Sequence, residues 1–269
     1  MQEKNTENQK NTTKETIAPC VRKRNPILLC LDKSGSMSFH QKAVFEAIHQ
    51  LFAETKKDNE TNVDMEYAFW VKTFNDRVEE CTDRAFVSPE TAALMFDRDR
   101  YQCCGGTGFV ELYTDLDQLY SAKGMFAQMK KGDFAPTLII PSDLEETDAR
   151  ENYEKAREKL HNNPLFAKSK RIVIFTGTSE EKRKAAVELA GGEEYVVTLG
   201  SNVRQLLTPV LIGTTMMRAN ATQMTNMTTT PSETGKKIRE KLEDGKRSAQ
   251  NLNDEELEKE LARYLKESS

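Results

Sequence analysis

The stretch PILLCLDKSGSMS, residues 26–38, decides the expected fold. Its first part, Pro26–Leu31, is short and almost continuously apolar, which is typical of a strand buried on both faces of a parallel sheet. Its second part consists mostly of small polar residues and follows the strand directly. The stretch therefore predicts an α/β protein with polar side chains gathered where a strand ends.

Outward from this stretch, short apolar runs alternate with amphipathic segments, which predicts parallel strands joined by helices. We expect a three-layer, open, mostly parallel sheet of the Rossmann-like kind, with one short antiparallel edge strand and about six flanking helices. Further strands are expected at residues 63–74, 77–81 (the antiparallel edge), 137–140, 171–175 and 194–199. Helices are expected near residues 39–56, 108–130 and 202–217, after a capping box Asp148-x-x-Glu151, and between Thr178-x-x-Glu181 and Gly191.

The two ends of the chain differ in composition from its middle. Only 37% of the 269 residues are hydrophobic, which is low for a globular protein. We expect a disordered arm over residues 1–24, a folded domain over residues 25–217, and a Thr-rich linker with a charged helical tail over residues 218–269. The tail's thin apolar stripe fits a solvated or docked helix, or a helix that binds a partner.

Composition also excludes several classes of function. A formal net charge of −4 gives no electrostatic argument for nucleic-acid binding. No apolar run is long enough for a membrane span, and the polar N-terminus does not resemble a secretory signal. The five cysteines include no CxxC spacing, so we expect a reduced, cytoplasmic protein.

Three separate segments carry oxygen-bearing side chains toward one edge of the expected sheet. Asp32, Ser34 and Ser36 follow the first strand, Thr107 lies in a Gly105–Gly108 loop before a helix, and Asp143 follows the strand at residues 137–140. Because ligands of open parallel sheets bind outside the carboxyl ends of the strands, these segments can meet there. Two carboxylates and three hydroxyls form an all-oxygen set suited to Mg²⁺ or Mn²⁺.

These residues closely resemble the metal-ion-dependent adhesion site (MIDAS) of von Willebrand factor type A (VWA) domains. Asp32-Lys-Ser34-Gly-Ser36 matches the family's Asp-x-Ser-x-Ser pattern, Gly105-Gly-Thr107 resembles its Gly-Gly-Thr loop, and Ser142-Asp143 resembles its later Ser-Asp turn, with Thr147-Asp148 downstream. The resemblance implies a VWA fold over about residues 26–217. It further implies a bound Mg²⁺ (or Mn²⁺) at Asp32, Ser34, Ser36, Thr107 and Asp143, and a protein partner that offers an Asp or Glu carboxylate to the ion.

Within the family, the chain most resembles bacterial intracellular VWA proteins linked to tellurium resistance. The Gly-Gly-Thr loop, the strand end Thr73-Phe74-Asn75-Asp76 and the compact single-domain layout carry this likeness. It implies a cytoplasmic adaptor in a bacterial stress-response or signalling assembly. We expect no enzyme activity, and from the composition no contact with nucleic acid or membrane.

One position departs from the family pattern. Leu144 stands where the family usually has glycine after the second aspartate, and leucine resists the positive φ that glycine allows. The turn could differ here, Asp143 could be displaced, or Glu145 or Glu146 could act as an alternative ligand. Leu144 therefore leaves open a structural subunit with a degenerate metal site. The cation itself could activate water or polarise a phosphoryl oxygen, which leaves open a metal-dependent phosphoester hydrolase.

Other motifs carry less weight. The glycine-rich loop lacks the lysine of a phosphate-binding P-loop. Adjacent Cys103 and Cys104, with no histidine at zinc-finger spacing, are expected to be ordinary loop cysteines. Trp70 alternates with Phe69 and Val71 in a strand and is expected in the core.

Overall fold

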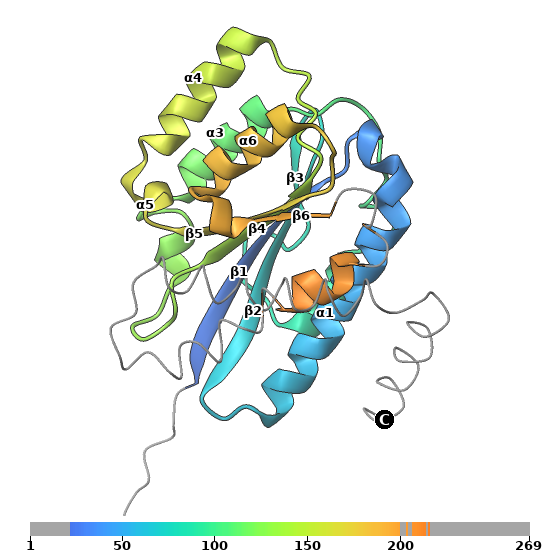
Figure 1. Ribbon diagram of the computed structural model, residues 1–269. Helices are drawn as coiled ribbons and strands as arrows, with labels where there is room; N and C mark the ends of the chain where they lie inside the picture. Colours follow the sequence, from blue (N-terminus) through green and yellow to red (C-terminus); the bar gives the residue numbers. More distant parts are fainter. Residues whose placement is uncertain (1–21, 200–202, 204–205, 214, 216–269) are drawn as a thin grey trace, which may run out of the picture.

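A six-stranded sheet forms the centre of the protein. The computed structural model describes residues 22–199, 203, 206–213 and 215. The sheet has the strand order β3-β2-β1-β4-β5-β6, and only the β2–β3 pair is antiparallel (Figure 1). This confirms the expected mostly parallel sheet with one short antiparallel edge strand. The strands are β1 (Lys23–Asp32), β2 (Met65–Phe74), β3 (Val78–Glu80), β4 (Thr137–Ser142), β5 (Lys170–Phe175) and β6 (Val196–Thr198).

Helices cover both faces of this sheet, which gives the three layers. The α-helices are α1 (Gln41–Thr61), α2 (Pro89–Met95), α3 (Phe109–Leu119), α4 (Arg150–His161), α5 (Pro164–Ala167) and α6 (Glu180–Ala190). Residues 206–213 are also helical. Three 3-10 helices are η1 (Gly35–His40), η2 (Met125–Gln128) and η3 (Glu193–Tyr195). The short helices α2 and α5 had no periodic signal long enough to predict them.

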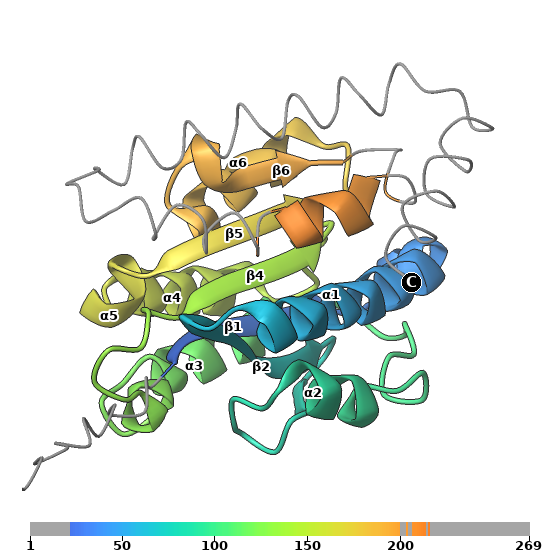
Figure 2. The same cartoon turned by 90° about the horizontal axis from the view of Figure 1, so that it is seen from below.

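Alternation along β1 divides the core in two. Ile27, Leu29 and Leu31 face α1, α2 and the helical residues 206–211. Leu28 and Cys30 face the other way, toward α3, α4, α5 and α6. Figure 2 shows the two helical layers on opposite sides of the strands. All five of these β1 side chains are fully buried, which explains the continuous apolar run in the sequence.

The chain reverses its direction of travel across the sheet beside β1. After β1 it adds β2 and β3 on one side, and it then returns to place β4, β5 and β6 on the other side. The β1–β4 pairing runs only from Ile27↔Thr137 to Leu29↔Ile139, so the carboxyl ends of these strands are not paired to each other. Such a switch point is where open α/β sheets form a binding crevice.

The start of β1 differs from the expectation for the N-terminal arm. The basic residues 22–24 were expected to end a solvated arm, but Lys23 and Arg24 already belong to β1. Arg24 pairs with Asp133 at 2.9 Å, and the backbone N–H of Phe134 donates to Arg24 O. Long-range partners thus fix a segment that looks like tail in the sequence. Residues 1–21 and the expected linker and tail at residues 218–269 lie outside the described residues.

The expected helix starts were partly wrong. Asp148 does not cap α4, whose N-cap residue Ala149 makes no side-chain cap. Instead, Asp148 Oδ2 accepts a 2.9 Å hydrogen bond from Val110 N in the first turn of α3. Ser179, rather than Thr178, caps α6, and Gly191 ends that helix with φ +82°, as expected.

Two further expectations concern the length of α3 and the tryptophan. The helix expected over residues 108–130 ends at Leu119 and is followed by turns and η2. Trp70 is buried as expected, with its indole N–H donating to Glu80. Within the described residues, no helix is both long enough and apolar enough to cross a membrane.

Candidate metal centre

Asp32 is the last residue of β1 and lies beside the switch point, with a fully buried side chain. Its Oδ1 accepts a 2.9 Å hydrogen bond from Ser34 N, and its Oδ2 accepts a 2.5 Å hydrogen bond from the Ser142 hydroxyl. The Tyr101 hydroxyl donates to the backbone O of Asp32 at 2.8 Å. Asp32 and Ser142 each lie at the end of their strand, so the ends of β1 and β4 meet through this carboxylate.

The two serines after Asp32 stay close to it. Ser34 is buried, Ser36 is exposed, and their hydroxyl oxygens lie 3.1 Å apart. Between them, Gly35 N donates to Gly105 O at 3.0 Å. A Cβ on Gly35 would lie 3.2 Å from that same oxygen, so glycine allows the two segments to approach. The first segment is therefore attached directly to the loop that carries Thr107.

Thr107 is buried in a loop held by three other segments. Its backbone N–H donates to the Thr147 hydroxyl at 2.9 Å, and Thr147 N donates back to Thr107 O at 3.1 Å. Asp76 accepts from Gly106 N at 2.9 Å, and Gly108 N donates to Asn75 O at 2.6 Å. The loop is thus fastened to the third segment and to the end of β2.

The residues that hold the Thr107 loop, namely Thr147, Asn75 and Asp76, had no role assigned to them from the sequence. In the sequence, Thr147 and the Asn75–Asp76 turn stand out only as part of the family pattern. Their polar side chains directly after a strand or a predicted turn were the available signal, but nothing local shows which distant amide they accept from.

Asp143 follows β4 and is nearly buried. Its Oδ1 accepts a hydrogen bond from Glu145 N at 3.2 Å. The next residue, Leu144, has φ +57°, the left-handed conformation that glycine usually supplies. Its backbone N–H donates to Ser142 Oγ at 2.9 Å, and its side chain is only 3% exposed. Burial of the leucine in the core offsets a backbone cost of about 1–2 kcal/mol.

The turn after Asp143 therefore has the backbone conformation that glycine usually supplies, although a leucine occupies the position. Neither acidic neighbour is turned toward Asp32, because Lys182 on α6 forms ion pairs with Glu146 and, at 3.9 Å, with Glu145. The suggestion that Glu145 or Glu146 replaces Asp143 receives no support from this arrangement.

The electrostatics of the edge favour an added cation. Burial raises the pKa of Asp32 to about 6, against the opposing effect of the hydrogen bonds from Ser142 and Ser34, and the Asp143 carboxylate raises it further. Among the described residues, no lysine, arginine or histidine forms an ion pair with Asp32 or Asp143. The neighbouring Lys33 is paired to Glu79 at 2.7 Å instead.

The donor set suits a hard cation and not a soft one. Asp32, Ser34 and Ser36 are linked by hydrogen bonds or close contact, and Asp143 is near enough to act on the Asp32 pKa. Within the described part of the chain, no group of three or more His, Cys, Asp or Glu side chains could hold a metal by itself. A cation at this edge would depend on hydroxyls and water beside two carboxylates, which matches the preferences of Mg²⁺ and Mn²⁺. Cys103 is half-buried and Cys104 exposed, both as free thiols.

The fold of this protein is VWA-like. The vWF domain of the type V pili tip protein Mfa5 from Porphyromonas gingivalis is similar, with 9% identity and a TM-score of 0.55 over 75% of this chain and 97% of that one. Proximal thread matrix protein 1 from the mussel byssus is similar with 17% identity and a TM-score of 0.51 over 71% of this chain and 48% of that one.

A second structure of the mussel protein, with a zinc-occupied MIDAS motif, matches at 16% identity, with a TM-score of 0.51 and the same coverage. This chain thus spans less than half the length of the mussel protein. No protein-family model and no curated protein matches the chain. At these identities the likeness establishes the fold, and the chemistry of the edge rests on the residues described above.

Proposed function

We propose that this protein is a metal-dependent protein-binding module. In this proposal Asp32, Ser34, Ser36, Thr107 and Asp143 hold Mg²⁺ (or Mn²⁺), directly or through water. The observation that carries it is the buried Asp32 carboxylate, which is oriented by Ser34 and Ser142 yet has no cationic partner among the described residues. Burying an unpaired carboxylate is costly, and a bound cation removes that cost.

The residues of this chain have distinct parts in the proposal. Ser142 holds Asp32 in one orientation and, through its bond from Leu144 N, fixes the turn that presents Asp143. Thr147 holds the loop of Thr107 in place. When bound, the metal supplies a Lewis-acidic position that accepts a carboxylate oxygen. Because three of the five donors are neutral hydroxyls, the bound ion would stay electron-poor and could accept an acidic side chain of a partner at an open position.

The surface beside the site supports a protein as the ligand. Phe39 lies in η1, three residues after Ser36, and is 85% exposed. Aromatic side chains are enriched at the centres of protein interfaces. A partner that brings its carboxylate to the edge would cover this ring.

Calorimetry with Mg²⁺ and Mn²⁺ tests the metal part of the proposal. We expect wild-type protein to bind one ion and Asp32→Ala to bind none. Asp64→Ala, an exposed aspartate at the opposite edge of the sheet, is the matched control and should bind as wild type does. Binding that survives in Asp32→Ala, or that is absent from folded wild-type protein, would contradict the proposal.

A pull-down with and without a chelator tests the partner part. We expect capture of a protein in Mg²⁺ that is lost with EDTA and with Asp32→Ala, and retained with Asp64→Ala. The proposal includes the finer points expected from the sequence: a cytoplasmic, non-enzymatic adaptor in a bacterial stress-response or tellurium-resistance-type assembly. A Mg²⁺- or Mn²⁺-dependent phosphatase activity lost in Asp32→Ala would overturn the non-enzymatic part.

A further inference from the structure

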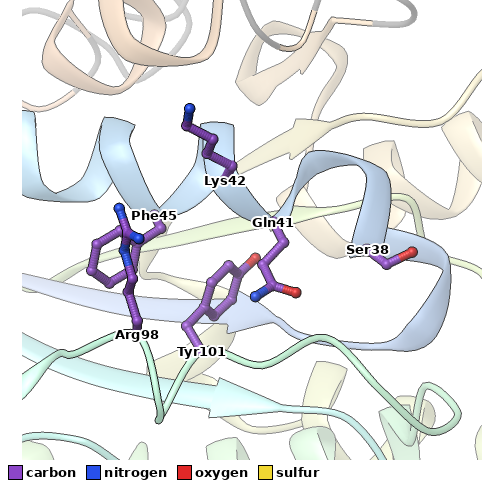
Figure 3. A pocket seen from close by; sticks show the side chains of 6 residues that line it. All are labelled: Ser38, Gln41, Lys42, Phe45, Arg98 and Tyr101. Carbon is purple, nitrogen blue, oxygen red and sulfur yellow. The ribbon is translucent and has the colours of Figure 1, made fainter.

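A pocket of about 310 Å³ lies beside the candidate metal centre. Its lining residues come from three segments: η1, the first two turns of α1, and the stretch between α2 and α3 (Figure 3). They are Ser38, Gln41, Lys42, Phe45, Arg98 and Tyr101. None of these residues belongs to the set proposed to hold the metal.

The wall of this pocket is shared with the metal centre. Tyr101 lines the pocket, and its hydroxyl donates to the backbone O of Asp32. Gln41 accepts a 3.1 Å hydrogen bond from Cys103 N and donates to Gln102 at 3.2 Å. These bonds tie the start of α1 to the segment that continues into the Thr107 loop. A ligand that reaches the metal edge would therefore pass close to a pocket with a fixed shape.

The pocket presents a cation, Arg98, that forms no ion pair with the described residues. The Arg98 guanidinium lies over the Phe45 ring, 5.6 Å from its centroid, and Figure 3 shows the two side chains next to each other. Arg98 is exposed and forms no ion pair among the described residues. Its neighbour Asp97 accepts a hydrogen bond from Arg100 N instead. Stacking on an aromatic ring leaves the edge of a guanidinium free to hold a carboxylate with two hydrogen bonds.

Lys42 adds a second positive charge at the rim. It is 82% exposed and pairs with Glu46 only at 3.7 Å in a solvated contact of little energetic value. In Figure 3 its amino group extends away from Tyr101, on the outer side of the lining residues. The metal centre itself is acidic, with Asp32 and Asp143. The two neighbouring sites therefore carry opposite charge. The metal centre is acidic and would bind a cation, whereas the pocket is basic and would bind an acidic group.

We propose that this pocket is a subsite for a second acidic side chain of the same partner segment. The inference rests on the proposed function: one carboxylate of the partner goes to the metal, and a further Asp or Glu a few residues away pairs with Arg98. The ligand class is accordingly an acidic peptide segment with two spaced carboxylates. Specificity comes from their spacing, since a single carboxylate can satisfy only the metal.

Synthetic peptides provide the test. Labelled peptides of the form Ser-Asp-(Gly)n-Glu-Ser, with one to four glycines, are compared with matched peptides in which Gln replaces Glu. Fluorescence anisotropy is measured in Mg²⁺ and in EDTA. We expect at least one spacing at which the Glu peptide binds about three- to fivefold more tightly than its Gln counterpart in Mg²⁺, the size expected for a partly solvated ion pair.

Variants assign that preference to the pocket. Arg98→Gln should bring the Glu-to-Gln ratio close to one and leave the affinity of the Gln peptide unchanged. Arg98→Lys should retain part of the preference. Arg150→Gln removes a 90% exposed arginine on α4 and should behave as wild type. Thermal melting of each variant checks that the fold is intact.

The outcomes separate the two proposals. Mg²⁺-dependent binding without a Glu preference, or a preference that persists in Arg98→Gln, would overturn the subsite and leave the metal-dependent function standing. If no peptide of either kind binds in a Mg²⁺-dependent way, the proposed function itself fails. Mg²⁺-dependent binding with a Glu preference that is lost in Arg98→Gln, partly kept in Arg98→Lys and unchanged in Arg150→Gln supports both.

Discussion

Two neighbouring strands each bury a charged side chain, and they treat it in opposite ways. Lys72 on β2 is 1% exposed and forms two ion pairs of 2.7 Å, with Glu80 on β3 and Asp115 on α3. Asp32 on β1 is equally buried, but the described residues give it only hydroxyl and amide donors. One charge is therefore neutralised by the protein itself, and the other is not.

The pKa values follow this difference. Burial alone would lower the pKa of Lys72, but Asp115 and Glu80 outweigh it and the net pKa is raised, which keeps the lysine charged. Burial raises the pKa of Asp32 to about 6, and no described lysine, arginine or histidine forms an ion pair with it. A buried charge with an internal partner stabilises its surroundings, whereas a buried charge without one is a place where an external ion can bind.

The largest expected effect on stability comes from replacing Lys72, the buried cation of the protein itself. Lys72→Met would leave Asp115 without its cation and Glu80 with only the exposed Arg84 at 3.6 Å, and we expect a loss of about 3 kcal/mol in the free energy of unfolding. Urea denaturation measures it. Mg²⁺ binding by the folded variant should persist, because Lys72 is not part of the metal edge. A loss below about 1 kcal/mol would mean that the buried pairs matter less than their distances suggest.

Removing the buried charge of Asp32 should have the opposite effect and stabilise the metal-free protein. Asp32→Asn removes the unpaired charge, and we expect the metal-free protein to gain about 1–3 kcal/mol at pH 7 while it loses Mg²⁺ binding. Because the folded pKa of about 6 lies above the ordinary value of 3.8, the penalty of Asp32 is absent below about pH 4 and complete above pH 6.

Denaturation in EDTA across this pH range checks the sign. The difference in stability between Asp32→Asn and wild type should grow as the pH rises from 4 to 6 and then stay level. A difference that shrinks as the pH rises, or a destabilised variant at pH 7, would show that Asp32 is compensated in a way that its contacts do not reveal.

Metal affinity should depend on the same titration. A proton on Asp32 competes with the cation, so we expect the Mg²⁺ or Mn²⁺ affinity to be level above about pH 6 and to fall up to tenfold per pH unit below it. Calorimetry at several pH values measures this, with Asp64→Ala as a control that should keep the same profile. An affinity unchanged between pH 7 and pH 5 would argue against Asp32 as a ligand.

The smallest expected effect concerns Leu144, the residue that follows the Asp143 carboxylate in the turn after β4. Leu144→Ala and Leu144→Gly both remove a buried side chain, but only glycine relieves the positive φ at this residue. We expect both variants to be less stable than wild type, with Leu144→Gly about 1 kcal/mol more stable than Leu144→Ala. Equal stabilities in urea denaturation would mean that the turn relaxes when the leucine side chain is lost.

Much of the fold could be predicted from the sequence because its signals are local. The apolar run at Pro26–Leu31, the alternation around Trp70 and the glycine at Gly191 each report their own backbone. The role of Asp148 could not be predicted, because an aspartate two residues before a helix can accept a hydrogen bond from any exposed amide that the fold brings near. Here that amide belongs to Val110, 38 residues away.

For the candidate site, too, some features could be predicted from the sequence and others depend on the fold. The sequence alone was enough to predict that Asp32 and Asp143 directly follow strands, with Ser34 and Ser36 just after Asp32, because strand periodicity shows where each strand ends and parallel strands end on one side. Thr107 lies in a loop before α3, and the family resemblance was the signal that grouped it with them. Only the tertiary structure decided that Ser142 orients Asp32, that Thr147 holds the loop of Thr107, and that Leu144 takes a glycine conformation. It also decided that Lys72 has a counterion and Asp32 has none among the described residues, since charge pairing depends on distances in space that no spacing along the chain records.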